Sequence, residues 1–337
     1  MKAFGGGMDV TQRAIDAIGK SSSDDWILEP QNHAKMLPAE ARLLRQVLED
    51  PELQAIIRTY NRYDEDANRA QWRYKFQAKG AAIASFLAIV VLPIYFFMPD
   101  EAMNIVYFAQ AALALLAAGL WLASSKGAFR RWVQSRAWAE YARINLFKAV
   151  LKKEESHRNE NELPLLSLQL EYFRRYLLDS QRLYYGKRGE YFIRARSGSK
   201  RWATVVFAIS ALPILWETQE RVHIRALDNL IATLPSKDIM RDIFLGVAIL
   251  AVGLEFLRTA YATVSDNYRN AWLYPKTGDK LDALSKEPLA EARAKALKAD
   301  KGAVMLFAES VETELVAEQR EWIAMSLGLD KPIRVPA

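Results

Sequence analysis

The chain has 337 residues, of which 51% are hydrophobic and 26% are charged, and its formal net charge is +6. The absence of cysteine excludes disulfides, thiolate metal sites and cysteine nucleophiles, and the three histidines are too far apart to suggest a metal site or a catalytic triad. The apolar residues are grouped in blocks between very polar stretches, so membrane segments are expected. No apolar stretch follows Lys2, so a cleaved signal peptide is not expected.

Residues 1–51 are predicted to form an N-terminal arm followed by an amphipathic helix. The first 36 residues contain a glycine triplet, serines and scattered polar residues, which favours a mobile or ligand-dependent arm with a short helix over 9–18. Beyond Pro38 the apolar residues fall on one helical face, and Asp50 followed by Pro51 restarts the helix at a cap. The apolar face comprises Leu43, Leu44, Val47 and Leu48.

Residues 52–160 contain two uncharged apolar runs, 81–98 and 102–123, which predict a membrane hairpin. As helices they would span roughly 27 and 33 Å, close to a hydrocarbon core of about 30 Å. A buried hairpin in a soluble protein is the alternative, although few soluble helices are apolar on every side. The proline-free stretch 52–80 predicts a helix that continues into the first run. Basic residues flank the hairpin and its connecting loop has none, so the positive-inside rule places both ends in the cytoplasm.

Residues 161–285 repeat this design, with a long basic and tyrosine-rich helix over 165–201 that leads into an apolar run. The offsets between the two copies are 110 and 120 residues; the ten extra residues are nearly three helical turns, so the same helical face is retained. We therefore predict a tandem duplication. The matching positions are Gln71 with Gln181, Tyr74 with Tyr184, and Pro93 with Pro213.

The second copy has weaker apolar runs, at 202–216 and 242–262. The first is short and the second contains Glu255 and Arg258, so both a four-pass and a two-pass membrane protein remain open. The loop 217–241 is expected to hold a short amphipathic helix on the far surface in the four-pass case. Both alternatives return the C-terminus to the cytoplasm.

The polar stretch 286–337 is predicted to form C-terminal cytosolic helices at 288–299 and 303–327. An apolar stripe on the last helix predicts packing against another helix or subunit. The stripe comprises Val304, Phe307, Val311, Leu315 and Trp322.

A pattern in residues 172–213 resembles the SLATT family, the SMODS/SLOG-associating two-transmembrane effectors of bacterial conflict systems. A basic helix enters an apolar hairpin after the motif residues Asp179, Gln181, Tyr184, Tyr185 and Lys187. The first copy looks like a more diverged member that lacks the second aromatic residue, and it carries Asp64, Gln71, Tyr74 and Lys75. The resemblance covers roughly 52–285, and the second copy departs from the family in its longer loop.

The resemblance implies a pore-forming or membrane-depolarising effector of an anti-phage, abortive-infection system. It implies a multi-pass homo-oligomer in the bacterial inner membrane, held inactive until a nucleotide or single-stranded oligonucleotide made by a neighbouring enzyme, or a cytosolic regulatory protein, signals infection. No enzymatic activity, cofactor or metal is expected, because the sequence shows no catalytic constellation, phosphate loop or ligand cluster. A non-conducting membrane scaffold that recruits cytosolic partners is the alternative function.

Residues 171–201 carry nine Lys or Arg and three acids, interleaved with tyrosines. Basic groups neutralise phosphates and aromatic faces stack on bases, which is compatible with a nucleotide or oligonucleotide ligand. Juxtamembrane basic residues also set topology and bind anionic headgroups, and this simpler role remains open. The predicted ligand-binding residues are Arg174, Arg175, Gln181, Arg182, Tyr184, Tyr185, Lys187 and Arg188.

Three polar residues in the apolar runs are predicted to line a pore, namely Glu255, Asn104 and Gln110. A carboxylate against lipid is costly, so Glu255 is expected to face protein or water, either in a pore or in an ordinary helical ion pair with Arg258. Asn104 and Gln110 are equally compatible with hydrogen bonds between helices. Pro93 and Pro213 are expected to kink their helices, and a gating hinge at either proline is a second possibility.

Overall fold

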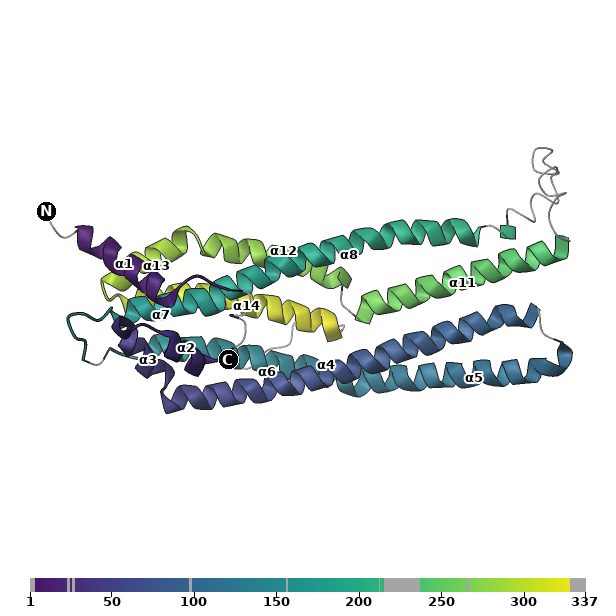
Figure 1. Ribbon diagram of the computed structural model, residues 1–337, viewed down its shortest axis with the longest axis horizontal. Coiled ribbons are helices and arrows are strands. Elements are labelled where there is room, and N and C mark those ends of the chain that lie inside the picture. Colours follow the sequence, from purple (N-terminus) through teal and green to yellow (C-terminus); the bar gives the residue numbers. More distant parts are fainter. Residues whose placement is uncertain are drawn as a thin grey trace, which may run out of the picture. The chain divides into compact units, whose positions relative to one another are not determined.

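The computed structural model describes residues 4–22, 25, 28–96, 99–155, 157–211, 213–214, 237–264 and 267–327. Every regular element in these ranges is helical, which confirms the all-α prediction (Figure 1). The chain divides into two compact units built from discontinuous segments. Unit 1 comprises Met1–Arg69, Arg131–Tyr191 and Arg269–Ala337, and unit 2 comprises Ala70–Arg130 and Phe192–Tyr268.

Unit 1 is a bundle of short helices together with the polar parts of longer ones. Its elements are α1 (Phe4–Ile18), α2 (Pro30–Met36), η1 (Ala39–Ala41), α3 (Arg42–Leu48), the first part of α4 (Pro51–Val91), α6 (Phe129–Lys152), α7 (Leu165–Phe173), η4 (Arg174–Asp179), the first part of α8 (Ser180–Ser210), α12 (Asn267–Leu284), α13 (Glu287–Leu297) and α14 (Lys301–Leu327). The predicted apolar face on 38–57 is buried, as is the predicted stripe on α14. The stripe packs against other helices of unit 1, with Phe307 against Phe173 and Trp322 edge-on to Trp132.

The start of α4 follows the predicted restart. Asp50 Oδ1 accepts a hydrogen bond of 2.8 Å from the backbone N–H of Glu52, and Pro51 fits the first turn because its missing N–H would have no intrahelical partner. From there α4 continues as one helix of 41 residues, which confirms the predicted passage from the polar stretch 52–80 into the first apolar run.

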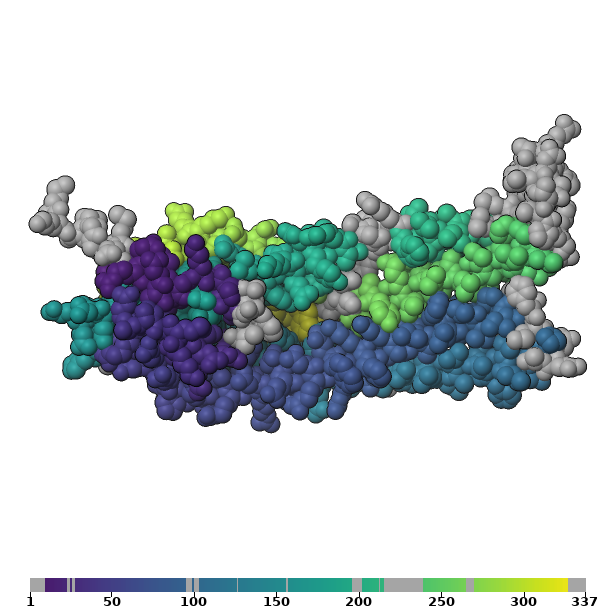
Figure 2. Space-filling model, viewed as in Figure 1, coloured from purple at the N-terminus to yellow at the C-terminus, as the bar shows by residue number. Residues whose placement is uncertain are grey.

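Unit 2 consists of the apolar parts of α4 and α8 with η2 (Leu92–Phe96), α5 (Asp100–Ala123), η3 (Ser124–Ala128) and α11 (Lys237–Val264). Its helices approach closely where glycines face larger side chains. A β-carbon on Gly253 would lie 3.1 Å from Ile89 and 3.2 Å from Phe86, and one on Gly246 would lie 3.6 Å from Pro93. These contacts run in opposite chain directions, so α11 packs antiparallel to α4 and η2. Figure 2 shows the green segment of α11 lying against the blue segment.

Within the described residues, three helical segments are long and apolar enough to cross a membrane: Pro51–Ile94, Met103–Ala123 and Ile239–Val264. They cover the predicted runs 81–98, 102–123 and 242–262 except for residues 95–98 and Ala102; of these, Phe97 and Met98 lie outside the description. The fourth predicted run, 202–216, does not qualify, because α8 ends at Ser210 and the run extends beyond the described residues. The loop helix expected within 217–241 lies outside the description up to residue 236.

The compact units cut across the predicted hairpin units 52–160 and 161–285. The polar helices of both hairpins belong to unit 1 and their apolar helices to unit 2. The N-terminal segment also differs from a free arm. Helix α1 packs against α7 and α13, and Arg13 forms a 2.6 Å ion pair with Glu40.

Candidate functional site

The predicted ligand helix begins as α7 and passes through a π-helical stretch, η4, before it becomes α8. A π-helical turn inserts an extra residue and shifts the helical phase, and such turns are frequent at functional sites. Here the stretch begins with two adjacent arginines, Arg174 and Arg175, and both turn toward other helices of unit 1.

Arg174 is buried in a network of carboxylates. Its Nε donates to Glu171 at 2.5 Å and its Nη1 to Asp179 at 2.6 Å, while Nη2 donates to the backbone oxygen of Gly19 at 3.0 Å. Glu171, only 2% exposed, also accepts two hydrogen bonds from Arg293 at 2.6 and 3.1 Å. A buried carboxylate is tolerable here because two guanidinium groups satisfy it.

Arg175 holds the segment that follows α1. Its Nε and Nη2 donate to the two carboxylate oxygens of Asp25 at 2.9 and 3.0 Å, and its Nη1 donates to the carbonyl oxygen of Ile18. Gly19 ends α1 with a φ of +80°, the left-handed conformation that favours glycine. The two arginines therefore cap the C-terminal carbonyls of α1, where positive charge is favourable.

His33 lies near the ion pair of Arg175 with Asp25, and its place in the sequence predicts no role for it. Its Nδ1 lies 3.0 Å from the hydroxyl of Tyr172, and its ring stacks on Tyr176 with a centroid separation of 3.9 Å. Burial is the main effect on His33 and lowers its pKa to about 4. The neighbouring charges have smaller, opposing effects, because Asp25 raises this pKa and Arg175 lowers it. No local sequence signal marks this position, because its partners lie about 140 residues away.

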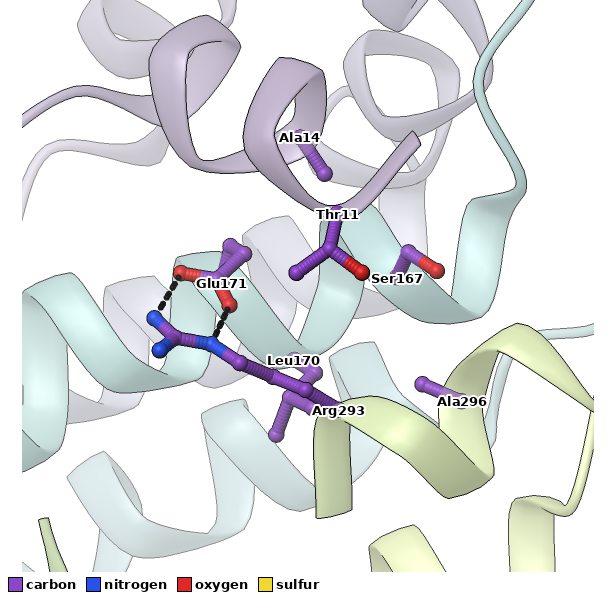
Figure 3. A pocket seen from close by; sticks show the side chains of 7 residues that line it. All are labelled: Thr11, Ala14, Ser167, Leu170, Glu171, Arg293 and Ala296. Carbon is purple, nitrogen blue, oxygen red and sulfur yellow. Dashed lines mark hydrogen bonds and ion pairs between the residues drawn. The ribbon is translucent and has the colours of Figure 1, made fainter. Parts of the chain in front are cut away.

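A small cleft opens beside Glu171 between α1, α7 and α13 (Figure 3). The space within it that a water molecule can occupy is only about 10 Å³, and its surface is mainly apolar. Pockets for nucleotide-sized ligands usually exceed about 300 Å³, so this cleft does not fit one. It is lined by Thr11, Ala14, Ser167, Leu170, Glu171, Arg293 and Ala296.

The remaining predicted ligand residues separate into buried and accessible groups. Gln181 is buried, and Tyr185 packs edge-on against Tyr274 with centroids 5.1 Å apart; burial raises the pKa of the Tyr185 phenol well above its ordinary value. Arg182 is half-buried and donates to Asp282 at 3.2 Å.

Three of the eight predicted residues lie on one exposed face of α8, at positions i, i+3 and i+4: Tyr184, Lys187 and Arg188. We call this set the exposed stripe. The guanidinium of Arg188 lies 6.0 Å from the ring centroid of Tyr184, at the outer limit for a cation–π contact. The structure thus groups these three and engages Arg174, Arg175 and Arg182 in ion pairs within unit 1.

In unit 2, Glu255 forms the ion pair that was the alternative to a pore position. Arg258 donates to it through Nε at 2.7 Å and also through Nη2, and Thr259 donates at 3.1 Å. Asn104 lies exposed on α5, whereas Gln110 on the same helix is half-buried. Pore lining by these three residues stays a prediction.

The two prolines lie beyond the ends of long helices. Pro93 belongs to the 3₁₀ turn η2 that follows α4, so the α-helix ends at Val91 instead of continuing through a kink. Pro213 lies beyond the last residue of α8, next to residues outside the description.

Among the described residues, no group of three or more His, Cys, Asp or Glu side chains is arranged to hold a metal ion. No protein-family model, no curated protein and no solved structure matches this chain.

Proposed function

We propose that this chain is the subunit of an oligomeric, ion-conducting membrane effector in a bacterial anti-phage system, with unit 2 in the inner membrane and unit 1 in the cytoplasm. The observation that carries the proposal is the exposure of large apolar side chains around the helices of unit 2. Phe108 is 78% exposed and Leu115 is 75% exposed, and others lie along α4 and α11. Water would penalise such a surface, whereas lipid would not.

The three chain segments that make up unit 1 support an even number of membrane crossings. Its three segments pack together, so they lie on one side of the membrane. Crossings by α4 and α5 return the chain to that side, but a crossing by α11 alone would leave Arg269–Ala337 on the opposite side. If α11 spans, residues 192–236 must therefore contain a fourth crossing, which favours the four-pass arrangement.

We propose that the exposed stripe receives the activating signal, a nucleotide or a single-stranded oligonucleotide, and that α8 transmits it. The stripe combines a tyrosine face with two cations that can neutralise phosphates. Helix α8 continues from Ser180 to Ser210 and contributes to both units, so a displacement at the stripe would act on the same helix that enters unit 2. Resemblance to the SLATT effectors supports a signal of this kind.

Membrane potential during controlled expression, with and without the neighbouring genes, tests this function. We expect depolarisation that the neighbouring genes suppress or trigger, and ion flux in liposomes containing the purified protein. Lys187→Glu combined with Arg188→Glu should abolish the response to the signal, whereas Lys298→Glu, an exposed lysine on unit 1, should not. Unchanged potential and no flux under every condition would reject the conducting function.

A non-conducting membrane scaffold is the second proposal. It is supported by exposed apolar side chains on unit 1, Leu306 and Trp272, which offer a surface to a cytosolic protein. Recovery of a stable complex that Leu306→Glu disrupts, without ion flux in liposomes, would favour the scaffold over the channel.

A further inference from the structure

Arg143 on α6 is buried in unit 1 with half of its guanidinium unpaired. The residue is only 4% exposed, and its Nε and Nη2 atoms have no hydrogen-bond partner among the described residues. Its nearest carboxylate, Glu140, lies 3.9 Å from Nη1, beyond hydrogen-bonding distance. A buried donor without an acceptor is costly, and a buried charge more so.

The Nε and Nη2 atoms form the edge of the guanidinium that grips two oxygens at once, and other arginines of this chain use it in that way. The same edge binds Glu162 in Arg42, at 2.5 and 3.1 Å. It binds Asp25 in Arg175 and Glu171 in Arg293. Only a planar fork facing a two-oxygen acceptor gives this geometry.

The carboxylates near Arg143 are already engaged elsewhere. Arg136, seven residues earlier on the same face of α6, pairs with Glu140 and donates to Asp64 of α4 at 2.9 Å. Neither carboxylate is therefore free to pair with the Nε–Nη2 edge of Arg143.

We propose that the Nε–Nη2 edge of Arg143 binds an oxyanion, a carboxylate or a phosphate that presents two oxygens. Such a ligand supplies both missing acceptors and the missing negative charge. This site differs from the exposed stripe, and the proposal does not rest on ion conduction, because binding is measured on the resting protein.

The test is the unfolding temperature of the full chain in detergent, titrated with inorganic phosphate or with acetate at an ionic strength held constant with chloride. We expect a saturable rise with at least one of the two anions, and the anion that acts distinguishes a phosphate site from a carboxylate site. Arg143→Gln should abolish the rise, and Arg143→Lys should weaken binding at least tenfold, because it keeps the charge and loses the fork. The matched control Arg158→Gln, an exposed arginine in the loop before α7, should respond like the wild type.

A wild type that responds to neither anion, or an equal response in wild type and Arg143→Gln, would overturn the proposal. A second variant tests the unpaired charge without a ligand. In buffer free of oxyanions, Arg143→Leu should raise the unfolding temperature, because it removes a buried charge that has no partner. A lower unfolding temperature would show that the guanidinium is already satisfied and would also contradict the proposal.

Discussion

Both units are helical, but they differ in where their large apolar side chains lie. In unit 1 the large apolar side chains are inside, and all of the largest fully buried ones, including Phe147, Tyr172 and Leu168, belong to it. In unit 2 the buried residues are mostly alanines such as Ala81, Ala84 and Ala251, and the large apolar side chains face outward.

Charges follow the same division. In unit 1, Glu171 joins residues of α7, η4 and α13, whereas in unit 2 Glu255 pairs with Arg258 within one turn of α11. The comparison teaches that helical content alone does not identify the surrounding medium. The size of the buried side chains distinguishes the two units: small buried residues are typical of close helix packing in lipid, as proposed for unit 2, and large ones of a core in water.

The largest expected difference between the units is in the stability lost when a phenylalanine side chain is truncated. Phe147→Ala should lower the free energy of unfolding by about 3–5 kcal/mol, because it opens a cavity in the core of unit 1. Phe108→Ala removes the same ring from the exposed face of α5 and should change stability by less than about 0.5 kcal/mol. Denaturant unfolding in detergent measures both, and equal losses would show that Phe108 is packed against protein.

The buried ion network should be nearly as sensitive. Glu171→Gln keeps the shape of the side chain but leaves Arg174 and Arg293 without their shared charge, so a loss of about 3 kcal/mol is expected. Glu312→Gln, which breaks a half-exposed pair with Lys148, should cost less than about 1 kcal/mol. Similar losses would mean that the network of Glu171 contributes no more than an ordinary surface pair.

Acid should weaken unit 1 through His33. Its folded pKa of about 4 lies below the ordinary value of 6.5, so the unfolded chain binds the proton more readily, and stability is lost as the pH falls from 6.5 through 4. The loss at pH 5 should be about 2 kcal/mol relative to pH 8. His33→Gln should remove this part of the pH dependence and His157→Gln, at an exposed position, should not; an unchanged slope in His33→Gln would refute the assignment.

The smallest effect is expected at the helix contact of unit 2. Gly253→Val would force its side chain against Phe86 and Ile89 and should cost about 1–2 kcal/mol. Gly119→Val on α5 meets nothing within 4 Å and should be nearly neutral or slightly stabilising. Thermal unfolding in detergent compares the two, and if both variants melt alike, α11 does not pack closely on α4.

Periodicity and length were enough to predict the helices, the passage of α4 from a polar into an apolar stretch, and the buried face of α14. These features depend on neighbours within a few turns. The grouping of polar helices into unit 1 depends on contacts between distant segments, such as Arg293 with Glu171, 122 residues apart, which no local pattern encodes.

The proposed ligand residues show the same limit. Tyr184, Lys187 and Arg188 share a face that helical spacing makes visible, yet Arg174 and Arg175 are redirected by the π-helical stretch η4. Because that stretch changes the helical phase, the inward direction of these two side chains could not be derived from the sequence. The unpaired edge of Arg143 likewise emerges only once the acceptors around it are known.

The central claim is that all three segments of unit 1 lie on one side of the membrane and that the chain crosses four times. The chain has no cysteine, so single substitutions report cleanly on a membrane-impermeant thiol reagent. His157→Cys in unit 1 should label only after the membrane is opened, and Thr233→Cys, between the second pair of predicted spans, should label in intact cells. Protection of Thr233→Cys in intact cells, with labelling only after opening, would place it on the side of unit 1 and contradict the four-pass arrangement.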